Sequence, residues 1–226
     1  MNMNMFQQFT SPELFLIPTA PLSMLIPVFL VYYKPKLLGN RMTTVTALFL
    51  KTFMLNMTSQ LTLKGQKWSN LLASLILIIL LSNLLSLLPY TFTPTSQLSM
   101  NMALALPLWL ATIIAGFKDK LSLTLAHLLP EGSPTPLIPF MILIETISLL
   151  MRPIALGVRL TANITAGHLL MTMVSSTTIN LISTYTSISS MAMVLLFLLM
   201  LLELAVACIQ AYVFVLLVIL YLQENT

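Results

Sequence analysis

The chain has 226 residues, of which 58% are hydrophobic and only 7% are charged, and its formal net charge is +4. Soluble domains carry about 25% charged residues, so this composition excludes a water-soluble globular protein and predicts an integral membrane protein. The Lys and Arg residues do not gather with aromatic residues on a polar face, which argues against binding to nucleic acid.

The first apolar segment, residues 12–33, is long enough to cross a hydrocarbon core of about 30 Å, although Pro18, Pro21 and Pro27 should kink it. No Lys or Arg precedes this segment, so it resembles neither a secretory signal nor an Arg-rich transit peptide. We therefore expect one N-terminal transmembrane helix in a chain that is inserted where it is made.

The next segment, residues 34–67, holds six of the ten Lys and Arg residues. Within it, residues 41–60 place apolar side chains on one side at helical spacing, which predicts a basic amphipathic helix on the membrane surface. A plain connecting loop is the alternative. The apolar positions are Val45, Leu48, Phe49, Phe53 and Met57.

Residues 69–88 and 97–116 each form an apolar run that can cross the bilayer, and together they predict a transmembrane hairpin. The first run ends at Pro89, and the second tolerates Pro107. A Pro- and Gly-rich turn region, "HLLPEGSPTP", follows the hairpin after two lysines.

The distribution of Lys and Arg predicts the topology. Segments 34–67 and 117–136 carry cations and should face the positive-inside compartment, whereas connections 89–97 and 174–187 contain none. The N-terminus is therefore expected outside and the C-terminus inside.

Two further apolar segments, residues 137–174 and 188–223, are too long for upright spans. At about 1.5 Å per residue each helix would be about 54 Å long, nearly twice the hydrocarbon thickness. The second segment contains no Gly or Pro at which it could fold back. We expect a long, strongly tilted two-helix hairpin, with another protein surface lying against it.

The tilted hairpin contains the only ionisable groups deep in apolar segments, and each costs at least about 2.5–3.5 kcal/mol near the bilayer centre. Such groups are functional candidates by default. In an antiparallel hairpin whose facing residue numbers add up to about 370, Arg159 lies level with Gln210 and His168 lies level with Glu203. The ionisable groups are Glu145, Arg152, Arg159, His168 and Glu203.

This set favours proton transfer by a moving carrier. His168, Glu203 and Glu145 can exchange protons near neutral pH, whereas the guanidinium of Arg159 cannot. Two half-paths separated by a fixed cation require a carrier carboxylate that loses its proton beside Arg159.

Structural roles remain open for several of these residues. Arg152 can snorkel to the membrane surface or pair with Glu145, and Glu145 is then a partner instead of a relay. His168 can act only as an interhelical hydrogen-bonding group, and Asn163 and Gln210 can simply join membrane helices.

Five motifs carry a resemblance to a known family. The chain closely resembles the subunit a family of rotary F-type ATP synthases, in its animal mitochondrial form, over essentially its whole length. The motifs are "SNLLSLLP" (82–89), "HLLPEGSPTPLIP" (127–139), "ETISLLMRP" (145–153), "ALGVRLTANITAGHLL" (155–170) and "LELAVACIQAYVF" (202–214).

The resemblance implies a role for most of the candidate residues. Arg159 matches the essential arginine that separates two half-channels and drives deprotonation of carboxylates on a rotating c-subunit ring. His168 and Glu203 match positions on the path from the intermembrane space, and Asn83 matches an asparagine near that side. Three further residues match positions on the matrix release path or near the arginine, namely Glu145, Asn163 and Gln210. Arg152 matches no assigned position.

The resemblance also implies partners and a location. The expected partners are the c-ring, the peripheral-stalk subunit b and small membrane subunits of the complex, and the expected location is the mitochondrial inner membrane. No cofactor or metal is expected. Because the chain lacks a phosphate-binding GxxxxGK[ST] loop, nucleotide chemistry is expected on other subunits.

The main rival is a proton-pumping or structural subunit of a respiratory-chain complex. A bis-histidine haem site needs paired histidines at bilayer depth, and only His168 qualifies because His127 lies in a turn region. A pump resembling an antiporter is expected to carry lysine within its spans, and every Lys here lies outside them. A purely structural scaffold remains as the third reading.

Overall fold

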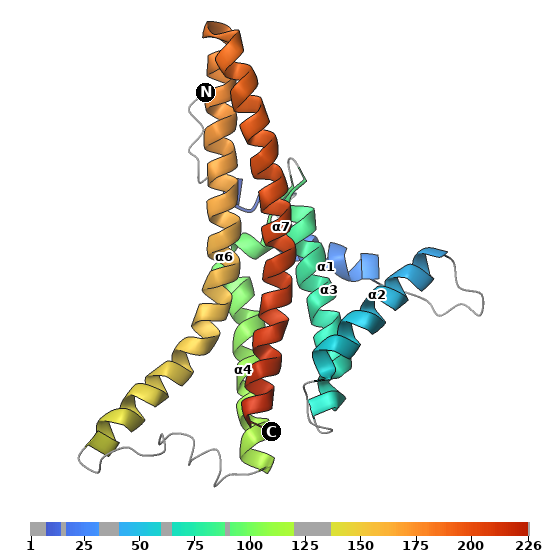
Figure 1. Cartoon of the computed structure of the whole chain (residues 1–226), viewed down its shortest axis with the longest axis vertical. Coiled ribbons are helices and arrows are strands. Elements are labelled where there is room, and N and C mark those ends of the chain that lie inside the picture. Colours follow the sequence, from blue (N-terminus) through green and yellow to red (C-terminus); the bar gives the residue numbers. More distant parts are fainter. Residues whose placement is uncertain are drawn as a thin grey trace. The chain divides into compact units, whose positions relative to one another are not determined.

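The computed structural model describes residues 8–14, 17–31, 41–59, 65–88, 91–119 and 137–225, and the helices below are labelled in Figure 1. Among these residues, four helices are long and apolar enough to cross a membrane. The only strands described are β1 (Glu13–Leu14) and β2 (Ile17–Pro18), which form one antiparallel two-residue pairing. The predicted all-helical membrane class is therefore confirmed.

The chain folds into two compact units, which are described separately. The long helices contribute residues to both. The first unit comprises Met1–Tyr32, Leu77–Met100 and Arg159–Tyr212, and the second comprises Tyr33–Ile76, Asn101–Val158 and Val213–Thr226.

Helix α1 (Thr19–Val31) begins directly after β2, in the first unit. The backbone N–H and the hydroxyl of Thr19 donate to the Pro12 carbonyl, at 3.2 and 2.7 Å, which fixes the start of the helix. Its 13 residues are about 20 Å long, so α1 is shorter than the span predicted over residues 12–33. The difference arises because the residue before Pro18 is held in an extended conformation.

Helix α2 (Arg41–Thr58) lies in the second unit and within the range predicted for the amphipathic helix. Its apolar side chains Val45, Leu48 and Leu55 are about 60% exposed, so the described residues of the second unit do not cover them. This exposure agrees with an apolar face that is available to lipid.

Helices α3 (Ser69–Ser86) and α4 (Leu98–Asp119) correspond to the two spans predicted as a hairpin. A short 3-10 helix, η2 (Gly65–Trp68), leads into α3, and α4 contains Pro107. The connection between them includes a second 3-10 turn, η3 (Pro94–Ser96). Most of the predicted basic turn region, residues 120–136, lies outside the described residues.

The last two helices are longer than predicted. Helix α6 (Ile138–Thr184) has 47 residues and α7 (Thr186–Asn225) has 40, which correspond to about 70 and 60 Å. Only Tyr185 separates them, whereas the sequence predicted a connection over residues 174–187. The polar stretch stays helical because its hydroxyls, such as those of Ser175 and Thr178, bond to carbonyls three residues back along the helix.

The two units differ in what they bury. The buried side chains of the second unit are mostly aliphatic or aromatic, for example Leu72 and Phe214. The first unit buries many polar side chains beside its aliphatic ones. These are Ser82, Asn83, Ser86, Thr93, Thr95, Thr161, Thr178 and Ser189. A polar interior of this kind is where a site for water or protons is expected.

Candidate functional site

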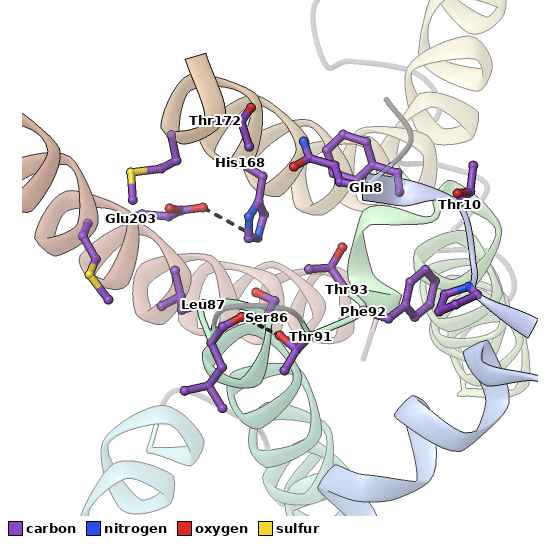
Figure 2. Close-up of a pocket in the computed structure, with 15 residues that line it drawn as sticks. Gln8, Thr10, Ser86, Leu87, Thr91, Phe92, Thr93, His168, Thr172 and Glu203 are labelled. Atoms are coloured by element: carbon purple, nitrogen blue, oxygen red, sulfur yellow. Dashed lines mark hydrogen bonds and ion pairs between the residues drawn. The ribbon is translucent and has the colours of Figure 1, made fainter. Parts of the chain in front are cut away.

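In the first unit α6 and α7 run antiparallel and bring His168 against Glu203 (Figure 2). The distance between His168 Nε2 and Glu203 Oε1 is 3.8 Å, and the two side chains are only 21% and 13% exposed. The predicted register, in which these residues lie level with each other, is confirmed. The separation is longer than a hydrogen bond, so neither group is held in a closed pair.

Gly167 provides the space that the Glu203 carboxylate occupies. A Cβ atom at position 167 would lie 2.8 Å from Glu203 Oε1 and 3.2 Å from its Cδ. Any side chain at this position must therefore displace the carboxylate.

His168 and Glu203 line a cavity of about 750 Å³ within the first unit (Figure 2). Helices α6 and α7 form one side of the cavity, and the end of α3, the following connection and the N-terminal residues form the other. The polar lining residues are Gln8, Thr10, Ser86, Thr91, Thr93, His168, Thr172 and Glu203.

Two polar atoms of this lining have no hydrogen-bond partner within the described part of the chain. They are the buried Nε2 of His168 and the buried Oγ1 of Thr93. Buried polar groups are almost always paired, with protein or with ordered water. The cavity is large enough for several water molecules, so these two atoms are expected to bind water.

A second, smaller cavity of about 230 Å³ lies beyond Glu203. Glu203 and Met171 line both cavities, and the smaller one also reaches Asn163. Glu203 thus borders both cavities, and the smaller one includes Asn163, which lies four residues after Arg159 along α6.

Arg159 is exposed, and no described residue forms an ion pair or a hydrogen bond with its side chain. Its neighbours Ala162 and Ala166 are also exposed, so small side chains continue the same face of α6. Small residues allow another helix to approach closely. The sequence predicted that Arg159 lies level with Gln210. No hydrogen bond joins the two side chains, because the Gln210 amide oxygen is buried without a partner among the described residues.

Arg152 behaves differently from Arg159. In the second unit its Nη1 donates to the Glu224 carboxylate, and its Nη2 lies 4.0 Å from Glu145 Oε1. The guanidinium also lies 5.0 Å from the ring centroid of Tyr221. The sequence left open whether Arg152 snorkels or pairs with Glu145; in the structure it faces Glu145 but bonds to Glu224, a partner that the sequence did not indicate.

Asn83 joins α3 to α7 in the first unit. Its side chain is fully buried, and its Nδ2 donates to the Ala207 carbonyl at 3.4 Å. Its Oδ1 has no partner among the described residues. Those residues also contain no group of three or more His, Cys, Asp and Glu side chains that could hold a metal ion.

The sequence did not identify Gly167, the connection after α3 or the N-terminal residues as parts of the site. Hydroxyls in an uncharged connection, such as those of Thr91 and Thr93, are the signal that could have pointed to the cavity. No sequence pattern indicated that residues 8–12 reach it.

Comparison with known proteins identifies the family of the chain. The sequence model described as ATP synthase A chain matches residues 14–223. The chain is similar over its full length, and over theirs, to proteins named ATP synthase F(0) complex subunit a from several vertebrates. The identity is 74% for Lycodon semicarinatus, 56% for Struthio camelus and 54% for Xenopus laevis. The family match, these relatives and the four apolar helices establish that the chain belongs to the ATP synthase A chain family, which is subunit a of the F(0) membrane sector.

Proposed function

We propose that this chain is the stator subunit that carries protons to and from the carboxylates of a c-subunit ring through two offset half-channels. Membership of the family makes it a multi-pass subunit of the proton-translocating membrane sector, of the mitochondrial type. The proposal concerns the path, the residues on it and the partners.

The uptake half-channel is the cavity lined by His168 and Glu203. Its unpartnered polar atoms favour a water-filled space, and both residues can accept and donate protons. Glu203 hands the proton onward because it also lines the smaller cavity that reaches Asn163. Asn83 supports this path by holding α3 against α7, so that the end of α3 closes the cavity.

Arg159 is the barrier between the half-channels. A guanidinium stays charged at every relevant pH, so it repels protons and attracts a carboxylate that has lost one. The single observation that carries the proposal is that Arg159 is exposed and lacks a counter-ion within the described residues. A membrane-embedded cation of this kind needs a carboxylate from another protein, and a passing c subunit supplies one.

The face around Arg159 suits such a partner. Ala162 and Ala166 leave room for the backbone of a neighbouring helix. Helix α7 presents exposed apolar side chains in the same unit, such as Leu202 and Ile209. Other subunits, including the peripheral-stalk subunit b and small membrane subunits, cover further parts of this surface.

The release half-channel leads to the matrix and includes Glu145, with Gln210 as a polar group near the arginine. Every described Lys and Arg except Arg159 belongs to the second unit, which also contains Glu145. By the positive-inside rule the segments that carry these cations lie on the matrix side. The N-terminus then faces the intermembrane space and the C-terminus faces the matrix.

The same reasoning gives the arrangement in the bilayer. Helix α2 lies on the matrix surface, α3 and α4 form a transmembrane hairpin, and α6 and α7 cross at a strong tilt. A tilt is required because both helices are at least twice as long as the hydrocarbon core is thick.

The substitution Arg159→Ala in the assembled complex tests the proposal. We expect proton-driven ATP synthesis to be lost while passive proton flux through the membrane sector rises, because the barrier between the two aqueous paths is gone. Arg41→Ala removes an exposed arginine of α2 and serves as the matched control, with normal synthesis expected. If the Arg159→Ala complex keeps full proton-driven synthesis, the chain acts as a scaffold and the proposal is wrong.

A further inference from the structure

We infer that Arg152 is a positioning residue that binds Glu224 and thereby leaves Glu145 free to exchange protons. The inference rests on the proposed function, in which Glu145 is the carboxylate of the release path. It concerns the second unit alone, where all three side chains lie.

The geometry is asymmetric. One guanidinium nitrogen of Arg152 is bonded to the Glu224 carboxylate, whereas the other lies 4.0 Å from Glu145, beyond hydrogen-bond distance. The Tyr221 ring lies under the guanidinium and limits its movement. A single cation thus faces two carboxylates and is bound to one of them.

The position of Glu224 explains why Arg152 binds this residue and not Glu145. It lies in the last turn of α7, which ends at Asn225. Unsatisfied carbonyls give the C-terminal end of a helix a partial negative charge, which disfavours a carboxylate there unless a cation neutralises it. Glu145 lies eight residues inside α6, near the opposite end of its helix, and does not face this penalty.

Binding to arginine limits proton exchange at the carboxylate that is bound. A carboxylate that is bonded directly to arginine accepts a charge-assisted hydrogen bond, so a proton must compete with the guanidinium for its oxygens. Glu145 is 37% exposed and is not in such a pair, so water can reach it. If Glu224 were neutral, the guanidinium would turn to Glu145 and block it.

This reasoning predicts an unusual pattern of rescue. Glu224→Gln alone should slow proton release about tenfold, the factor that corresponds to about 1.4 kcal/mol, although position 224 is not itself on the path. The double variant Arg152→Gln with Glu224→Gln should restore release, because no cation remains to capture Glu145. The measurement is passive proton flux and proton-driven ATP synthesis by the assembled complex.

Three further variants separate the possible outcomes. Glu145→Gln should abolish release; if it does not, the proposed release path is wrong whatever happens at Arg152. If Glu145→Gln abolishes release but the double variant is no faster than Glu224→Gln, then Arg152 only fastens α6 to α7 and the inference is wrong. Glu13→Gln removes an exposed carboxylate from the first unit and is the matched control, with no effect expected. Arg152→Lys keeps the cation and should keep the wild-type rate, and a tenfold loss in that variant would also overturn the inference.

Discussion

Replacing Gly167 by alanine tests whether the position of the Glu203 carboxylate limits proton uptake. The new methyl group would lie 2.8 Å from Glu203 Oε1, whereas ordinary contacts begin at 3.4 Å, so the carboxylate must withdraw by about 0.6 Å. The carboxylate is the free end of a flexible side chain, and the fold can therefore accommodate the change. Gly→Ala inside a helix also stabilises it by roughly 0.5–1 kcal/mol.

The expected result is a complex that assembles normally but takes up protons slowly. A misplacement of 1 Å in a reacting geometry can cost about a hundredfold in rate, so a shift of about 0.6 Å should cost on the order of tenfold. The assay is proton-driven ATP synthesis in inner-membrane vesicles, with the amount of assembled complex measured in the same vesicles.

Gly157→Ala is the control for this experiment. It makes the same substitution on the same helix, but its methyl group meets the thioether of Met102, at 2.6 Å from the sulfur, instead of a carboxylate. Methionine side chains readily move into other gaps, so assembly should again be normal. If Gly167→Ala retains the rate of the Gly157→Ala complex, then the space beside Glu203 plays no part in uptake.

Two other predictions concern the same unit. The register set by His168 and Glu203 places Ile164 opposite Ala207, and both residues are buried. Cysteines at these two positions should therefore crosslink under mild oxidation, whereas cysteines at Ile164 and the exposed Ile209 should not. The opposite pattern would show that the register is wrong. Thr93→Val removes a buried hydroxyl that has no described protein partner. The free energy of unfolding should therefore change by no more than about 0.5 kcal/mol, while the rate of proton uptake falls severalfold. An unchanged uptake rate would show that water at Thr93 is not on the path.

The class of the fold and part of the site could be predicted from the sequence, since both depend on local patterns. Apolar runs of about 20 residues predict spans wherever they occur. The register of α6 and α7 was also predictable, because His168 and Glu203 are isolated polar groups whose separate burial would be costly. Each of these inferences needs only neighbouring residues or one pairing.

Other features depend on contacts that no local pattern encodes. The helix between residues 174 and 184 persists because hydroxyls bond to carbonyls within the same helix, and such residues are equally common in turns. The partner of Arg152 lies 72 positions away, and the sequence offered the nearer Glu145 instead. The cavity requires the N-terminal residues to fold against the end of α3, a tertiary contact that composition does not reveal.

The two arginines of α6 show how one helix can use the same side chain for opposite purposes. Arg152 is satisfied within the chain by a carboxylate and an aromatic ring, whereas Arg159 has no such partner among the described residues. An unpaired cation at membrane depth is costly, and a continuous water path past it would dissipate about 2.3 kcal/mol per proton for every 100 mV of membrane potential. In the proposed function both problems have one solution: a carboxylate of another protein pairs with Arg159 after it has lost its proton, and carries a proton across the gap when it has gained one. On this proposal, the cost of leaving Arg159 unpaired is the physical reason why proton flow is coupled to the movement of the partner.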